Sequence, residues 1–305
     1  MKVVVVNDAI TQIPGTRTFW SDLVEWFGAE FVCAPFQDLP ALASSIECDV
    51  MIRNGSYWPA ITSNAKQVSL IQDIFDDSPL RAMQREAIAS SVPIYNSSFT
   101  AEKCGDAGGK VIPLPVDFRS FEPQNAMGCQ QALGLPDGCI CWVGATQGPA
   151  GHVKGYDIFL KIVRMNPDLH FVGVFKDAIP DSFPPNLRCF LRLTHEELVK
   201  VIGACRVGLC TSRMESQHLA GIEMGACGLK LIVPDTGVYW KREDLPIWRV
   251  TDPTPQNYAA SIRGVLPESS FNEHVRGLWQ KEFDRPVIRA QWEKLIAEVE
   301  NDPPK

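Results

Sequence analysis

Short apolar runs alternate with segments of helical periodicity along most of the chain, and this alternation limits the possible folds more than any other feature. The run Val3–Val6 is continuously apolar, as expected for a strand buried on both faces of a parallel sheet. Helical spacing of apolar residues follows over Thr18–Phe27 and Ser78–Ser91. Further strand candidates in this part of the chain are 30–34, 49–52, 67–71 and 93–96. The alternation predicts a doubly wound α/β unit over the first ~115 residues.

A second series of the same kind follows a change in composition. Residues 118–138 are rich in Pro, Gln, Gly and Asn, which favours a domain boundary there. The predicted strands are 139–143, 170–175, 187–190, 207–212 and 230–233, and the predicted helices are 157–164, 196–205, 219–227, 271–283 and 289–300. Residues 144–155 are expected to form a loop with four glycines. The sequence therefore predicts two α/β domains in tandem.

The length and charge of the chain limit the classes of partner. With 305 residues the chain is long enough for two domains that each bury a core. Its 29 Lys and Arg against 36 Asp and Glu give a net charge of −7, which argues against a surface that neutralises many nucleic-acid phosphates. A small anionic ligand needs only one or two cations and some backbone N–H groups. A small anion is therefore favoured over nucleic acid.

The cysteines and histidines indicate neither disulfides nor a metal site. The ten cysteines include no C-x-x-C pair, several lie in apolar runs, and the five histidines are scattered. We therefore expect structural thiols in a reducing compartment. The chain opens directly on a strand without a signal-peptide pattern, and no run reaches the ~18 apolar residues of a membrane span. These features predict a soluble cytoplasmic protein whose sequence lacks the ligand spacing of a metal site.

Residues 207–237 combine polar and charged side chains between two predicted strands. Glu215 lies in the loop after the first strand, and Glu223 lies in the short helix that begins near Leu219. Loops after parallel strands, and the first turns of the helices that follow, are where open α/β sheets bind ligands. The N-terminus of that short helix directs free N–H groups and the positive end of its dipole toward an anion. The pattern predicts an anion site with two nearby carboxylates.

A second group of candidates lies in the first domain. Gly15, Thr16 and Arg17 end the loop after the first strand, and Asp73 follows another strand. A glycine-bearing loop between a strand and a helix can approach an anion, although a plain turn explains the same residues. Asp73 can face a cleft or solvate its loop. We take these four residues as candidates for lining a cleft in the first domain.

Three stretches together resemble the retaining GT-B glycosyltransferases of the glycosyltransferase family 4 type. Glu215–Glu223 matches the family's E-x7-E signature and continues into Met224–Gly228 and the glycine-containing turn Pro234–Gly237. Val143–Gly155 is similar to the family's V-G-R loop followed by K-G. Val111–Phe121 looks like the family's I-P-N-G-V-D linker. The conjunction of these stretches is more specific than E-x7-E alone.

The resemblance implies a fold and a division of the chain. The fold is α/β of the GT-B class, with two Rossmann-like doubly wound domains facing across a cleft. Residues 1–118 would bind the acceptor, 119–283 would bind the nucleotide sugar, and 284–305 would form a helix that packs back on the first domain. The active site would lie in the cleft, with domain closure as the expected motion.

The resemblance also implies the activity and the residues that carry it. Glu215 would contact the transferred sugar and Lys154 the leaving group, as catalytic residues, while Glu223 would accept hydrogen bonds from ribose. The other implied donor-binding residues are Gly144, Gly155, Gln217, His218, Leu219 and Leu191. The implied reaction moves a hexose from a nucleotide sugar, UDP- or GDP-linked, to a glycan, a lipid-linked glycan or a small molecule. It retains the anomeric configuration, uses the leaving phosphate as base, and needs neither cofactor nor metal.

Several residues depart from the family pattern. Ala145 stands where the family usually has arginine, and Gln72 stands near a common histidine. Gln217 and His218 replace an aromatic residue and a glycine, so the His218 side chain can donate to the donor or block the approach that glycine allows. The candidates for the missing cation are Arg17, Arg53 and Arg213. A sugar-nucleotide epimerase, a non-catalytic nucleotide-sugar-binding protein and a transferase acting on a nucleic-acid base are the alternatives.

Overall fold

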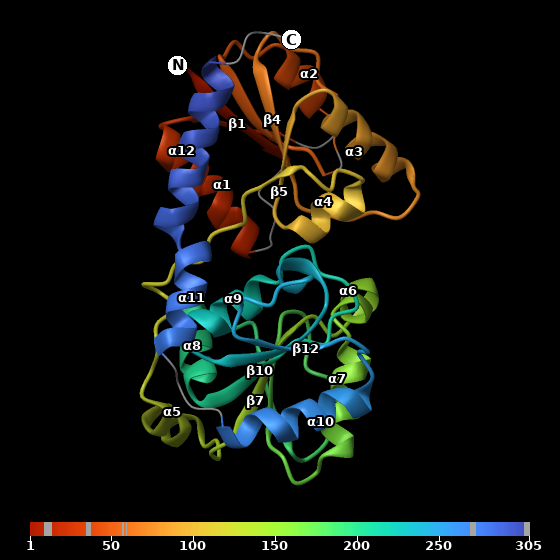
Figure 1. Ribbon diagram of the computed structural model, residues 1–305, viewed down its shortest axis with the longest axis vertical. Helices are drawn as coiled ribbons and strands as arrows, with labels where there is room; N and C mark the ends of the chain where they lie inside the picture. The colour runs from red at the N-terminus through yellow and green to blue at the C-terminus, as the bar shows by residue number, and fades with distance from the viewer. Residues whose placement is uncertain (9–13, 35–37, 57, 59, 269–272, 302–305) are drawn as a thin grey trace. The chain divides into compact units, whose positions relative to one another are not determined.

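The protein divides into two compact units. The computed structural model describes residues 1–8, 14–34, 38–56, 58, 60–268 and 273–301. Unit 1 comprises residues 1–115 together with 286–305, and unit 2 comprises residues 116–285 (Figure 1). Each unit has its own parallel sheet.

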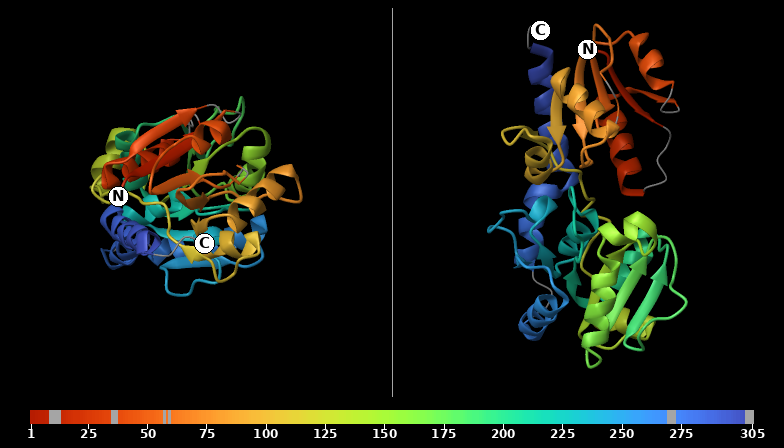
Figure 2. Two further views of the ribbon diagram at one scale, coloured as in Figure 1. Left: turned by 90° about the horizontal axis from the view of Figure 1, so that it is seen from above. Right: turned by 90° about the vertical axis from the view of Figure 1, so that its right-hand side faces the viewer.

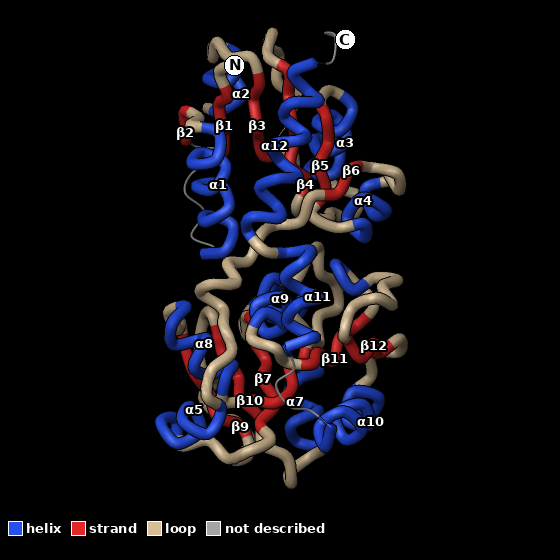
Figure 3. Tube along the Cα trace, turned by 60° about the vertical axis from the view of Figure 1, so that its left-hand side comes forward, coloured by secondary structure: helices blue, strands red, loops and turns tan. Residues whose placement is uncertain are grey.

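Unit 1 is built on a parallel sheet whose described strands run in the order β2-β1-β3-β4-β5-β6. The strands are β1 (Val3–Asp8), β2 (Glu30–Ala34), β3 (Val50–Asn54), β4 (Lys66–Ile71), β5 (Val92–Tyr95) and β6 (Lys110–Val111). The helices are α1 (Pro14–Phe27), α2 (Leu39–Ser44), α3 (Pro79–Ala89), α4 (Ser98–Cys104) and α12 (Arg285–Asn301). Helices flank the strands of this unit (Figure 3).

The core of unit 1 explains why its first strand is uniformly apolar. Val4 and Val6 pack in a cluster with Met51 and Trp58, and Val3–Val6 are all at most 5% exposed because both faces of the sheet are covered. The last helix, α12, belongs to this unit. The rings of Phe19 and Trp292 lie 5.8 Å apart between centroids.

Unit 2 repeats the plan with the strand order β12-β11-β10-β7-β8-β9, again with parallel pairing throughout its described residues. The strands are β7 (Cys139–Gly144), β8 (Phe171–Phe175), β9 (Leu187–Leu191), β10 (Cys205–Leu209), β11 (Lys230–Pro234) and β12 (Ile247–Val250). The helices are α5 (Ala126–Leu133), α6 (Gly148–Val153), α7 (Tyr156–Met165), α8 (His195–Gly203), α9 (Leu219–Ala226), α10 (Pro255–Val265) and α11 (Glu273–Phe283), with 3₁₀ turns at Gly237–Tyr239 and Leu266–Glu268.

The central strand of unit 2 contributes alternate side chains to two cores. Cys139 and Cys141 lie in one hydrophobic cluster, whereas Ile140 and Trp142 lie in the other. This alternation follows from the two-residue period of a strand, and it places helices on both sides of the sheet. Figure 2 shows the same strands and helices from two further directions.

The cysteines of both units are unpaired thiols. All ten are free, and most are buried or partly buried, as expected from their positions in apolar runs. Among the described helices none combines the length and the apolar character needed to cross a lipid bilayer.

Several predicted boundaries are wrong. The helix predicted from Thr18 begins at Pro14, a favourable first position because proline lacks only an N–H that would have no helical partner there. The predicted linker contains α5, which is capped by the Asn125 side chain and ended by Gly134 at a φ of 62°. The predicted loop 144–155 contains α6. The strand predicted to end at Ser212 ends at Leu209.

Candidate functional site

Two loops at the carboxyl edge of the unit 2 sheet are fastened together by Thr211. Its hydroxyl lies 3.1 Å from the carbonyl oxygen of Lys154 and 3.0 Å from that of Gly155, and it donates to this pair. The indole N–H of Trp142 donates to the same hydroxyl at 2.9 Å. Gly155 has a φ of +67°, and a Cβ there would lie 1.9 Å from the Thr211 carbonyl oxygen. Only glycine fits at this point, where the two loops cross. The close contact fixes the backbone that carries Lys154.

Arg213 strengthens the same junction. Its backbone N–H donates to the Val153 carbonyl at 2.8 Å, and its guanidinium donates to the His152 carbonyl and bidentately to Asp157. Arg213, one of the three arginine candidates named from the sequence, is therefore held in a structural ion pair. Of the other two arginine candidates, Arg53 is fully buried in β3 of unit 1, and the side chain of Arg17 lies outside the described part of the structure.

Lys154 and Glu215 form an ion pair at the centre of these loops. The Lys154 Nζ donates to Glu215 Oε1 at 2.6 Å, and the Ser212 hydroxyl donates to the same oxygen at 2.6 Å. Glu215 is only 7% exposed, whereas the Lys154 side chain is 29% exposed. Burial raises the pKa of Glu215, but the charge and hydrogen bond of Lys154 more than offset it, so the pKa lies below its usual value. Glu215 is therefore an ionised carboxylate.

His218 adopts a backbone conformation that favours glycine. Its φ is 72°, in the left-handed region, and it immediately precedes α9 without a side-chain cap hydrogen bond. Its Nδ1 lies 2.6 Å from the Tyr239 hydroxyl, and its side chain is 6% exposed. A Cβ at Gly221 would lie 1.8 Å from that hydroxyl. The ring thus folds onto Tyr239 in space that Gly221 leaves open. Desolvation lowers the pKa of His218 to about 4, so it is neutral at pH 7.

Glu223 lies on α9 in a partly buried position. Burial raises its pKa to about 7, and the charge of Lys176 opposes that rise. Near neutral pH this carboxyl is therefore divided between its protonated and ionised forms. Of the neighbouring predicted residues, Gln217 is 2% exposed, and Leu219 is partly buried against the core of unit 2.

Cys210, Glu215 and His218 bring ligand-type atoms within 4.8 Å of one another. The Lys154 ammonium already lies against Glu215, so a divalent cation in this cluster would face a positive charge at close range. Desolvation also raises the pKa of the Cys210 thiol to about 12, which disfavours the thiolate that a metal needs. We therefore describe these three residues as an electrostatic cluster around an ion pair.

The remaining predicted residues divide between the two units. Gly144 ends β7 and Leu191 ends β9, so both lie at the carboxyl edge of the unit 2 sheet. Asp73 lies in unit 1, where it is exposed and its backbone N–H donates to the Ser56 hydroxyl at 3.1 Å. The backbone of residues 15–17 belongs to the first turns of α1, so the expected loop placement of Gly15 is wrong. The side chains of Thr16 and Arg17 are outside the described residues.

Sequence reasoning missed three residues of this region. Thr211 fastens the two loops, Tyr239 holds the His218 ring, and Lys176 follows β8 at the same edge of the sheet. A lysine directly after a predicted buried strand was the available signal for Lys176. The roles of Thr211 and Tyr239 depend on contacts across the fold, which no local pattern indicates.

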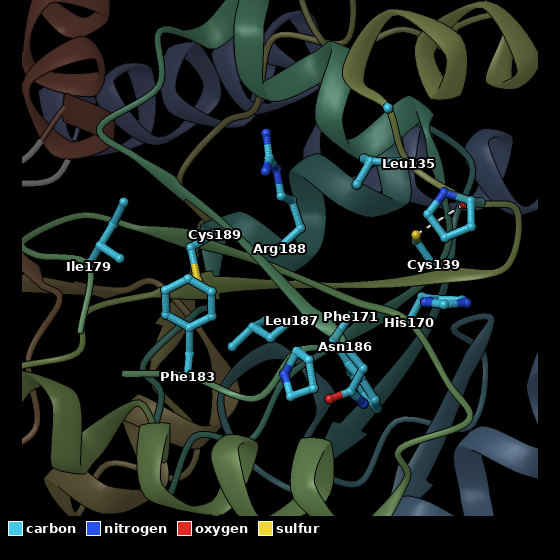
Figure 4. A pocket seen from close by; sticks show the side chains of 13 residues that line it. Leu135, Cys139, His170, Phe171, Ile179, Phe183, Asn186, Leu187, Arg188 and Cys189 are labelled. Atoms are coloured by element: carbon cyan, nitrogen blue, oxygen red, sulfur yellow. Dashed lines mark hydrogen bonds between the residues drawn. The ribbon is translucent and has the colours of Figure 1, made fainter. Parts of the chain in front are cut away.

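Two hollows in unit 2 lie elsewhere. One of about 350 Å³ is lined by residues that include Cys139, Phe171, Phe183 and Leu187 (Figure 4). Cys139, Phe171 and Leu187 begin their strands, so this hollow lies at the amino ends of β7, β8 and β9. A second of about 450 Å³ includes Cys205, which begins β10. Ligands of open α/β sheets bind at the carboxyl ends, so neither hollow belongs to the candidate site.

No protein-family model and no curated protein sequence matches the chain, but solved structures share its fold. Sucrose-phosphate synthase from Thermosynechococcus elongatus has a TM-score of 0.79 at 13% identity, covering 98% of this chain and 99% of its own. HepE from Anabaena in complex with UDP-glucose has a TM-score of 0.76 at 15% identity, covering 98% and 100%. A glycosyltransferase from Rickettsia africae has a TM-score of 0.73 at 10% identity, covering 99% and 100%.

These comparisons establish the architecture. The two parallel sheets with their flanking helices match those structures over nearly the whole chain. The predicted GT-B class, with two Rossmann-like doubly wound domains, is confirmed as the fold of this protein. At identities of 10 to 15% the likeness extends to the fold alone.

Proposed function

We propose that the protein is a retaining glycosyltransferase of the family 4 type, a hexosyltransferase that uses a nucleotide sugar and no metal. The observation that carries this proposal is the Lys154–Glu215 ion pair, held at the carboxyl edge of the sheet beside the start of α9. HepE, which shares the fold, was solved with UDP-glucose. That complex makes UDP-glucose the first donor to test, with GDP-sugars second.

Each part of the donor has a suitable partner in this cluster. The Lys154 ammonium and the N–H groups at the start of α9 suit the diphosphate. Glu223 suits the ribose, because its carboxylate accepts hydrogen bonds from hydroxyl groups. Glu215 suits the sugar: its two side-chain hydrogen bonds within the described residues both use Oε1, which leaves Oε2 to accept from sugar hydroxyls.

The proposed reaction needs no enzyme nucleophile. The acceptor hydroxyl oxygen forms a bond to the anomeric carbon on the face from which the diphosphate departs, which retains the configuration. The bond from that carbon to the phosphate oxygen breaks, and its electron pair stays on the phosphate. That phosphate takes the proton of the acceptor hydroxyl and so acts as the base. Lys154 stabilises the negative charge that develops on the leaving group.

Binding is the first test of the proposal. A thermal-shift screen with UDP, GDP, ADP, CMP and their sugars should raise the midpoint for the true donor, because a ligand of the folded state stabilises it. Lys154→Ala should lose most of that shift, whereas Lys161→Ala, an exposed lysine on α7, should keep it. Absence of a shift with every nucleotide would contradict the proposal.

The products of turnover separate the alternatives. With a donor that binds, NMR of the first transfer product should show the donor's anomeric configuration, and an inverted product would exclude a retaining reaction. Isomerisation of the donor without acceptor would indicate an epimerase. Binding without turnover against a panel of glycan, lipid-linked and small-molecule acceptors would indicate a non-catalytic binding protein.

The proposed independence from metal has its own test. Added EDTA should leave the rate of sugar transfer unchanged.

A further inference from the structure

Lys176 stands directly beside the loop that leads to Lys154. It follows the last residue of β8, and its backbone N–H donates to the Gly144 carbonyl at 3.1 Å. In the parallel pairing of β7 with β8, Gly144 is opposite Phe175. Lys176 is therefore at the carboxyl edge of the sheet, next to the first residue of the 144–155 segment.

The backbone of Lys176 is fixed from its other side as well. The guanidinium of Arg192 donates to the carbonyls of Lys176 and Asp177 at 3.3 and 3.1 Å. The Asp177 carboxylate in turn accepts the backbone N–H groups of Thr146 and Gln147 at 2.7 to 3.0 Å. These bonds tie the segments after β7, β8 and β9 into one network, which holds the Cα of Lys176 in place.

The side chain of Lys176, unlike its backbone, makes no fixed contact within the described residues. The residue as a whole is exposed, although the surrounding protein partly desolvates its ammonium, and across the described part of the chain no hydrogen bond or ion pair of that ammonium is found. Arg213, by comparison, is held in a bidentate pair with Asp157. A fixed backbone that carries an unpaired cation at a ligand-binding edge is suited to an anion that arrives from solution.

The charges around Lys176 favour the same kind of ligand. Desolvation and then the charge of Lys154 lower the pKa of Lys176, while the carboxyls of Glu223 and Glu215 raise it. Glu215 is already bonded to Lys154, and the pKa of Glu223 is about 7. At neutral pH Glu215 is ionised and already paired with Lys154, whereas no such partner of the Lys176 ammonium is found among the described residues.

We propose that Lys176 is the second cation that contacts the diphosphate of the donor, an inference that rests on the proposed function of this site. Ala145, which follows β7, offers no charge, and Lys176 reaches the same edge from the neighbouring strand. A diphosphate carries more than one negative charge, and two separate ammonium groups stabilise it better than one. Lys176 thus adds to Lys154 both in binding the donor and in stabilising the leaving group.

Calorimetry with UDP and uridine tests this assignment. Lys176→Ala should weaken UDP binding about tenfold or more, as expected for the loss of a charged hydrogen bond. It should change uridine binding less than about twofold, because uridine has no phosphate. Lys176→Arg should keep most of the UDP affinity, and the matched control Lys161→Ala all of it. Lys176→Gln serves as a second neutral variant if the alanine variant fails to fold.

The failure of this inference is distinguishable from the failure of the proposed function. If Lys176→Ala and Lys176→Gln bind UDP as the wild type does, while Lys154→Ala loses it, then Lys176 is a solvated surface lysine and the inference is wrong. If the wild type binds no nucleotide at all, the proposed donor site itself is wrong, and the role of Lys176 falls with it.

Discussion

Replacing Gly221 by alanine should destabilise unit 2, although the same change stabilises most helices. The added Cβ would lie 1.8 Å from the Tyr239 hydroxyl and 2.4 Å from His218 Nδ1. Neither ring can move freely, because Tyr239 is fully buried and His218 nearly so. Overpacking of this kind costs roughly 1–3 kcal/mol, which exceeds the gain of about 1 kcal/mol from alanine's helix propensity.

A double variant that removes the two clashing groups tests whether the clash causes the loss of stability. In the His218→Gly, Tyr239→Leu background both clashing side-chain ends are absent, because a leucine side chain stops short of the tyrosine hydroxyl position, and glycine readily adopts the left-handed φ of residue 218. Gly221→Ala should there stabilise the protein by up to about 1 kcal/mol, so the sign of its effect reverses. Gly277→Ala, on α11 where no atom lies within 4 Å of the new Cβ, should stabilise both backgrounds alike.

The measurement is urea unfolding followed by tryptophan fluorescence, with far-UV circular dichroism as a second probe. Coincident transitions are needed before free energies of unfolding are compared, because the protein has two units. If Gly221→Ala stabilises the otherwise unchanged chain, or costs equally in both backgrounds, then His218 and Tyr239 do not occupy the space that this reasoning gives them.

Three further predictions concern the same region. In the folded protein the pKa of His218 is about 4, below its ordinary value of 6.5. Its contribution of about 3 kcal/mol to the free energy of unfolding is therefore present above pH 6.5 and is lost as the pH falls toward 4. His218→Asn, which tolerates a positive φ, should flatten that acid limb in urea titrations. Ribose hydroxyls that donate to Glu223 favour its ionised form, so affinity for UDP-glucose should rise with pH through about 7; calorimetry should show this rise in the wild type and not in Glu223→Gln, and a flat wild-type profile would count against the ribose contact. Gly155→Ala should lower the unfolding free energy by at least about 1–2 kcal/mol for the left-handed φ alone, and an unchanged thermal midpoint would show that the crossing with Thr211 is looser than described.

Local sequence signals located most elements because they depend on neighbours in the chain. The continuous apolar run Val3–Val6 is buried as the sequence predicts. The errors occur where tertiary contacts decide. Gly151 reads as a loop residue, yet it lies in α6, where glycine is needed because a Cβ would lie 2.5 Å from the Thr146 backbone.

The candidate site was predictable only to the extent that its parts are close in sequence. Glu215 and Glu223 could be proposed from one stretch, and Lys154 from another, but their pairing required the crossing at Gly155. The orientation of His218 was not predictable, because it depends on a tyrosine after another strand. Lys176 escaped notice because its importance follows from the neighbouring position of β7 and β8.

The return of α12 to unit 1 has a consequence for how the chain is made. Lys66 in β4 donates to the carbonyls of Val299 and Glu300 on α12 at 3.0 and 2.8 Å, and the first of these contacts spans 233 residues. During synthesis the chain of unit 2 is complete before α12 has emerged. Until then, the surface of unit 1 that α12 covers stays exposed. We expect a fragment ending at residue 115 to expose that surface, and a permuted gene that begins at residue 286 to let unit 1 close first.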